Sequence, residues 1–127
     1  MYKAEVTNNG GYRFDVKSGE YTFVIDAKGG GITPPDTLLA SLASCAGVYA
    51  RKYFDGAKIK VDEFKVTASA EFSKEAPLAF RTIVLAIETK GVQLDERRKA
   101  ACLEFIKNCP VHNTLKAGPA VEMTISS

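Results

Sequence analysis

The segment from residue 36 to about residue 54 constrains the fold most, because its pattern is that of a helix with apolar side chains on nearly every face. The apolar positions fall on two adjacent faces: Leu38, Leu42, Cys45 and Tyr49 on one, and Leu39, Ala43, Ala46 and Ala50 on the next. Such a helix is buried on most of its sides. A small sheet does not cover it alone, whereas two copies packed together would, so the sequence predicts a homodimer with a shared core.

Turn signals and alternating apolar residues divide the rest of the chain into short strands and a second helix. Asn8-Asn9-Gly10-Gly11 is typical of a hairpin turn, and Thr33 and Asp36 predict the start of the long helix. The expected second helix covers residues 95–108, and the expected strands cover residues 2–7, 12–16, 21–27, 58–73, 80–89 and 120–126. A change of parity near Asp62 predicts a β-bulge. This order predicts an α+β fold with a long buried central helix and both helices on one face of a mainly antiparallel sheet.

Length and charge limit the classes of protein that this chain can belong to. Its 127 residues, of which 46% are hydrophobic, are typical of one globular domain, so residues 1–127 are expected to form a single domain. A net charge of +2 argues against binding to nucleic acid or to a membrane surface. The uncharged helix-like stretch 37–50 is shorter than the ~20 residues of a membrane span. The first residues lack an apolar signal region, so we expect a cytoplasmic protein.

The chain has three cysteines, and an odd number without an export signal predicts reduced thiols. Cys45 lies at the centre of the long helix, where a cysteine is usually an inert core residue. Reactivity there requires a nearby cation. Cys102 is surrounded by ordinary helix-core residues and is predicted to be structural.

Cys109 stands directly before Pro110, which breaks or restarts the second helix. Two interpretations are open: a thiol mobile enough to meet a second sulfur, or a buried cysteine at a helix end. His112 follows at a spacing that suits a metal, but two ligands are too few for structural zinc. His112 is therefore interpreted as a loop residue rather than a base or a ligand, and neither a metal nor an organic cofactor is expected.

Two segments together resemble a known family. One is Pro34-Pro35-Asp36-Thr37-Leu38-Leu39-Ala40-Ser41-Leu42-Ala43-Ser44-Cys45, and the other is Asn108-Cys109-Pro110-Val111-His112-Asn113-Thr114-Leu115. At this spacing they are similar to the OsmC/Ohr family of thiol peroxidases, and the resemblance covers essentially the whole chain. It implies an intertwined homodimer with two sites at the subunit interface. It also implies reduction of organic or inorganic hydroperoxides, with an external dithiol that restores the thiols.

The resemblance also implies roles for individual residues. Cys45 matches the peroxidatic cysteine, which becomes a sulfenic acid, and Cys109 matches the resolving cysteine, which closes a disulfide with it. Arg13 matches the arginine that contacts the thiolate. Asp36 stands where the family commonly has a glutamate that orients this arginine, and its side chain is one methylene shorter.

Other interpretations remain open beside the peroxidase. Leu42, Tyr49 and Tyr53 would either favour peroxides with hydrophobic tails or simply pack in the core. The same dimeric fold would also suit a small-molecule-binding protein whose thiols are incidental. Further alternatives are a metal protein that uses Cys109, His112 and partner residues, and a structural oligomer without a ligand.

Overall fold

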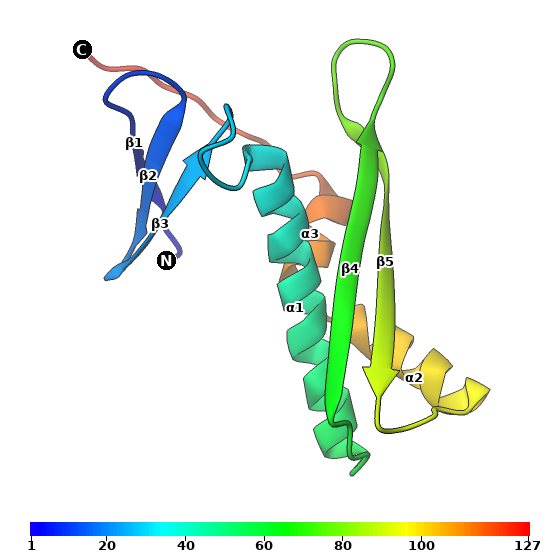
Figure 1. Cartoon of the computed structure of the whole chain (residues 1–127). Helices are drawn as coiled ribbons and strands as arrows, with labels where there is room; N and C mark the ends of the chain where they lie inside the picture. Colours follow the sequence, from blue (N-terminus) through cyan, green and yellow to red (C-terminus); the bar gives the residue numbers. More distant parts are fainter. The chain divides into compact units, whose positions relative to one another are not determined.

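The computed structural model describes all residues from 1 to 127, and the chain divides into two compact units, Met1–Ala40 and Ser41–Ser127 (Figure 1). The elements are β1 (Glu5–Thr7), β2 (Arg13–Ser18), β3 (Tyr21–Asp26), α1 (Pro34–Gly56), β4 (Glu63–Phe72), β5 (Phe80–Lys90), α2 (Glu96–Ile106) and α3 (Pro110–Ala117). Both sheets are antiparallel, which confirms the predicted α+β class. The prediction of a single domain over residues 1–127 stays a prediction.

The first unit contains a three-stranded sheet in the order β1-β2-β3. β2 and β3 pair from Arg13 opposite Asp26 to Ser18 opposite Tyr21. Between β1 and β2, the Asn8 side chain donates hydrogen bonds to the carbonyl oxygens of Gly10 and Arg13. This side chain closes the predicted hairpin turn, in which Gly10 adopts a positive φ of 116°.

The long helix α1 begins two residues before its predicted start and ends two residues after its predicted end. Thr33 Oγ1 accepts a hydrogen bond from the Asp36 N–H at 3.3 Å and donates one to the Asp36 carboxylate at 2.8 Å. The first of these bonds satisfies a free N–H of the first helical turn, as an N-cap residue does, and the second makes Asp36 the side-chain partner of Thr33. At the other end, Ile59 N–H donates to the Phe54 carbonyl at 2.9 Å while Lys58 has a φ of 56°. These features form a Schellman motif, which turns Ile59 into the core.

The second unit has its core between α1, α2 and one face of the β4–β5 sheet, and β4 runs along α1 in Figure 1. The half-buried face pairs Phe64 with Thr89 and Val66 with Ile87. The opposite face is exposed and carries the ion pairs Lys90–Glu63 and Lys65–Glu88. The fully buried part of the core is formed by Ala46, Ala50 and Phe54, and Ile59, Val61, Cys102 and Ile106 complete it.

Four predictions about the strands, the helices and the sheet are corrected. The strand predicted over 58–73 starts only at Glu63, because the Schellman motif of α1 occupies the preceding residues, and no bulge lies at Asp62. The one register shift lies between Ala70 and Phe72. The helix predicted over 95–108 ends at Ile106, and a further helix, α3, follows the predicted break. The sheet is two separate sheets rather than one.

The strand predicted over 120–126 is absent, and this segment has no regular structure. Its alternating apolar side chains are almost fully exposed: Val121 at 76%, Met123 at 86% and Ile125 at 97%. A strand needs a neighbour that accepts and donates its backbone hydrogen bonds, and no segment of the same chain pairs with this one.

Candidate functional site: a pair of thiols between two helices

Cys45 lies in α1, about two and a half turns after Asp36, as the helical repeat requires. Its neighbour Ala46 and the preceding-turn residue Leu42 are buried, and Cys45 itself is half-buried. The thiol therefore sits at the edge of the apolar face of α1, where solvent still reaches it.

Cys109 caps the N-terminus of α3 and is fully buried. Because Pro110 occupies the first helical position and lacks an N–H, the first free N–H groups of α3 belong to Val111 and His112. The His112 N–H donates a hydrogen bond to Cys109 Sγ at 3.4 Å. Of the two interpretations of Cys109, the buried cysteine at a helix end is confirmed. Its thiol also interacts with the side chain of Cys45.

The structure brings Cys45 and Cys109 together from elements far apart in the sequence. Burial raises the pKa of Cys109 most, and its interaction with the Cys45 side chain raises it further. The N–H groups of His112 and Val111 act in the opposite direction without overcoming burial. Cys109 is therefore a protonated thiol at neutral pH, held beside a more accessible one.

Burial also raises the pKa of Cys102, so two thiols hold their protons more tightly in the folded chain than in the unfolded chain. The free energy of unfolding should therefore fall as pH rises above the ordinary thiol pKa of about 8.5. The double variant Cys102→Ala/Cys109→Ala should show a flatter fall in its denaturant midpoint between about pH 8 and about pH 10. Parallel pH profiles for the two proteins would contradict this assignment.

A cluster of aromatic side chains begins one helical turn after Cys45 in α1. Tyr49 follows Cys45 by four residues, and Phe105 precedes Cys109 by four. Their ring centroids are 6.1 Å apart, and Phe105 also contacts Tyr53 at 6.2 Å. Phe105 was not among the predicted site residues, and no periodicity relates it to Cys109, because α2 ends at Ile106.

Arg13 and Asp36 have other partners within the chain. The Arg13 guanidinium pairs with the Asp15 carboxylate at 3.2 Å, since residues two apart on β2 lie on the same face. The Asp36 carboxylate accepts a hydrogen bond from the Thr33 hydroxyl at the start of α1. The chain's ion pairs include none between Arg13 and Asp36. A role for either residue beside Cys45 stays a prediction.

The remaining candidate, His112, lies in the first turn of α3 rather than in the predicted loop, because the chain becomes helical again at Pro110. It is half-buried, and its Nδ1 lies 3.3 Å from the Asn113 side-chain oxygen. No cluster of three or more His, Cys, Asp or Glu side chains is arranged to hold a metal ion. None of the helices is both long enough and apolar enough to cross a membrane.

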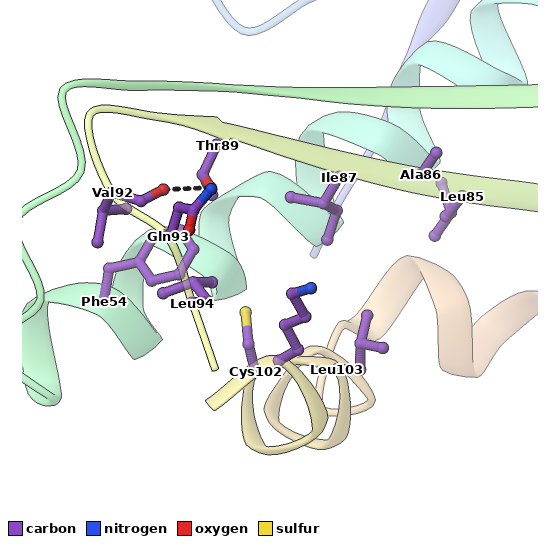
Figure 2. A pocket seen from close by; sticks show the side chains of 11 residues that line it. Phe54, Leu85, Ala86, Ile87, Thr89, Val92, Gln93, Leu94, Cys102 and Leu103 are labelled. Carbon is purple, nitrogen blue, oxygen red and sulfur yellow. Dashed lines mark hydrogen bonds between the residues drawn. The ribbon is translucent and has the colours of Figure 1, made fainter. Parts of the chain in front are cut away.

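A separate apolar pocket lies between β5, the start of α2 and the end of α1 (Figure 2). Its volume is about 620 Å³, and Phe54, Ile87, Leu94 and Cys102 are among its lining residues. Neither Cys45 nor Cys109 lines it. Cys102 belongs to the core of this unit, as its predicted structural role requires.

Comparison with known proteins agrees with this arrangement. The model of the family described as OsmC-like protein matches residues 27–124, which include both Cys45 and Cys109. Comparison with curated protein sequences gives no significant match.

Solved structures share the fold at low sequence identity. An OsmC-like protein from Mycoplasma pneumoniae is 22% identical with a TM-score of 0.79, and the match covers 91% of this chain and 87% of that one. An organic hydroperoxide resistance protein from Elizabethkingia anophelis is 24% identical with a TM-score of 0.67, over 91% and 88% of the two chains. An organic hydroperoxide resistance protein of Bacillus subtilis is 17% identical with a TM-score of 0.68, over 91% and 90%. The chain, with its two thiols between α1 and α3, belongs to the OsmC-like protein family.

Proposed function

We propose that this chain is a thiol peroxidase that reduces organic hydroperoxides, and inorganic ones as well, through Cys45 and Cys109. The observation that carries the proposal is the meeting of these two thiols, one half-buried and one fully buried, at the junction of two helices. An inert core cysteine needs no second thiol beside it, whereas a disulfide-forming peroxidase does. The solved relatives described as organic hydroperoxide resistance proteins support the same class of substrate.

The reaction begins with attack of the Cys45 thiolate on the distal oxygen of the hydroperoxide. The O–O bond breaks, the alkoxide takes a proton and leaves as an alcohol, and Cys45 becomes a sulfenic acid. The Cys109 thiol then condenses with the sulfenic acid, which forms the Cys45–Cys109 disulfide and releases water. An external dithiol reduces this disulfide and is itself oxidised to a disulfide.

The rings beside the thiols support a preference for hydroperoxides with apolar tails. Tyr49 and Phe105 are partly exposed and pack against each other, and Tyr49 lies one helical turn after Cys45. An apolar tail that covers these rings would exclude water from them, which favours it over hydrogen peroxide. Three free cysteines also fit a reducing compartment, and we place the protein in the cytoplasm.

Exposed apolar surface supports the homodimer. The alternating side chains of residues 121–125 lack a strand partner, and Leu38 and Val48 of α1 are 40% and 52% exposed. A second copy would cover the open faces of α1 and could pair with the tail. The dimer would also give Arg13 and Asp36 a second chain whose Cys45 they could serve.

Thiol counting during peroxide titration tests the proposal. Cumene hydroperoxide should reduce the number of free thiols from the three of the reduced chain to one, with the end point at about one equivalent. The alternative function is binding of an apolar small molecule, and the pocket of about 620 Å³ away from the thiol pair favours it. That alternative predicts an unchanged thiol count together with binding of an apolar fluorescent probe.

Arg13→Ala is expected to move the alkylation of Cys45 to higher pH. If the guanidinium stabilises the Cys45 thiolate, its loss should lower the thiolate fraction at neutral pH by about tenfold, which is one pH unit in the alkylation midpoint. Rates of iodoacetamide labelling across pH measure this shift, and Arg81→Ala, on exposed β5, is the matched control. Identical profiles for Arg13→Ala and the parent would remove Arg13 from the site.

A further inference from the structure

We propose that the external dithiol attacks Cys45, rather than Cys109, when it reduces the disulfide, and that Cys109 is the sulfur released. This inference rests on the proposed function, because the Cys45–Cys109 disulfide is its starting point. The two sulfurs differ in how easily an attacking thiolate can reach them. An attacking thiolate must reach the target sulfur along the line of the S–S bond, from the side away from it. Cys109 is 0% exposed, whereas Cys45 is half-buried at the edge of α1.

Backbone N–H groups stand ready to stabilise the Cys109 thiolate that would be released. Cys109 caps α3, and the His112 N–H already donates to its sulfur at 3.4 Å. The Val111 N–H acts on the same sulfur. These N–H groups have no partner within the helix, so a thiolate formed at Cys109 takes over hydrogen bonds at the positive end of α3.

Release of Cys45 in the opposite direction would have no such backbone donors. Cys45 lies in the interior of α1, where each N–H is bonded to a carbonyl of the preceding turn. Only a cation such as Arg13 could stabilise a thiolate there. If Arg13 does so, the thiolates of Cys45 and Cys109 become more similar in stability. The greater exposure of Cys45 to solvent then decides which sulfur is attacked.

The step balances as a thiol–disulfide exchange. One thiolate of the dithiol bonds to Cys45 Sγ as the S–S bond breaks, and the electron pair leaves on Cys109, which then takes a proton. The second thiol of the reductant attacks the mixed disulfide at the reductant's own sulfur and frees Cys45 as a thiolate. The protein gains two electrons, and the dithiol becomes a disulfide.

A trapping experiment distinguishes the two directions. The Cys45–Cys109 disulfide is formed with diamide, which needs no peroxidase activity, and is treated briefly with limiting 2-mercaptoethanol. The reaction is quenched with acid, free thiols are blocked with N-ethylmaleimide, and peptides are mapped by mass spectrometry. The adduct is expected on Cys45 with at least about tenfold excess over Cys109. Cys102→Ala, which lacks the third thiol, should give the same map.

An adduct on Cys109, or an equal division between the two cysteines, would overturn the inference, as would failure of diamide to form the bond. Failure of the proposed function looks different, because diamide would form the disulfide while cumene hydroperoxide would not.

A second measurement tests the role of α3. Val111→Pro removes one of the N–H groups that face Cys109, and α1 shows that a helix of this chain can begin with two prolines, Pro34-Pro35. The rate of disulfide reduction should fall by about threefold relative to Val111→Ala, for a change of about one unit in the pKa of the leaving thiol. Equal rates in the two variants would contradict a role for these N–H groups.

Discussion

Cys45→Ser is expected to abolish peroxide consumption, leaving only the rate of protein-free solution. A serine hydroxyl is not ionised near neutral pH and does not form the sulfenic acid on which every later step depends. The variant should fold normally, since oxygen replaces sulfur at a half-buried position that forms no part of the buried core cluster. Peroxide remaining after incubation with reduced protein, measured over time in the presence of dithiothreitol, gives the rate.

The other two cysteines separate chemistry from folding. In the absence of dithiothreitol, Cys109→Ser should consume about one equivalent of peroxide and then stop, because the sulfenic acid forms but no disulfide resolves it. Cys102→Ser is the matched control, since Cys102 lies in the core and lines the separate pocket. Its turnover should equal that of the parent. If Cys45→Ser consumes peroxide as fast as Cys102→Ser, Cys45 is not the nucleophile.

The second large effect is on stability: Phe54→Ala should lower the free energy of unfolding by about 3–5 kcal/mol. Phe54 is fully buried at the C-terminal end of α1. Its ring packs edge-on against Phe64 and Tyr53, with centroid distances of 5.6 Å and 5.9 Å. Alanine would lose these contacts and leave a cavity that the backbone of α1 and β4 does not close. Since the free energy of unfolding of small domains is about 5–15 kcal/mol, a loss of this size would bring the variant close to unfolding.

Urea denaturation followed by circular dichroism measures this loss. Phe72→Ala is the control, because Phe72 is 49% exposed and stacks only on Phe80 at 4.7 Å. Phe72→Ala should lower the free energy of unfolding by no more than about 1.5 kcal/mol. Equal losses in the two variants would mean that Phe54 does not anchor the core of the second unit.

Local patterns predicted the elements whose stability is local. The capping residues Thr33 and Asp36 and the apolar faces of α1 were evident in the sequence, and so was the helix break at Pro110. Alternation also predicted strands where β4 and β5 lie, although it placed the irregularity near Asp62 rather than between Ala70 and Phe72. These features depend on neighbours in the sequence or on the pleat of one strand, so the periodicity of apolar residues is enough to predict them.

Features that depend on a partner could not be read in the same way. The alternation of residues 120–126 is that of a strand, but strand formation requires pairing with a sheet edge, and this segment pairs with none within the chain. Asp36 satisfied both an N-cap pattern and an arginine-orienting pattern, and within the chain the nearby Thr33 hydroxyl is its partner. The sequence left open whether the helix ends or restarts at Pro110, because the eight residues of α3 are too few to show a helical period.

The central claim is that Cys45 and Cys109 form a redox pair, and mass mapping after one equivalent of peroxide tests it most directly. Reduced protein is treated with cumene hydroperoxide, alkylated, digested without reduction and analysed for linked peptides. We expect one dominant linkage, which joins the peptide of Cys45 to that of Cys109 and leaves Cys102 alkylated. A map in which all three cysteines are alkylated, or in which Cys102 is the linked residue, would contradict it.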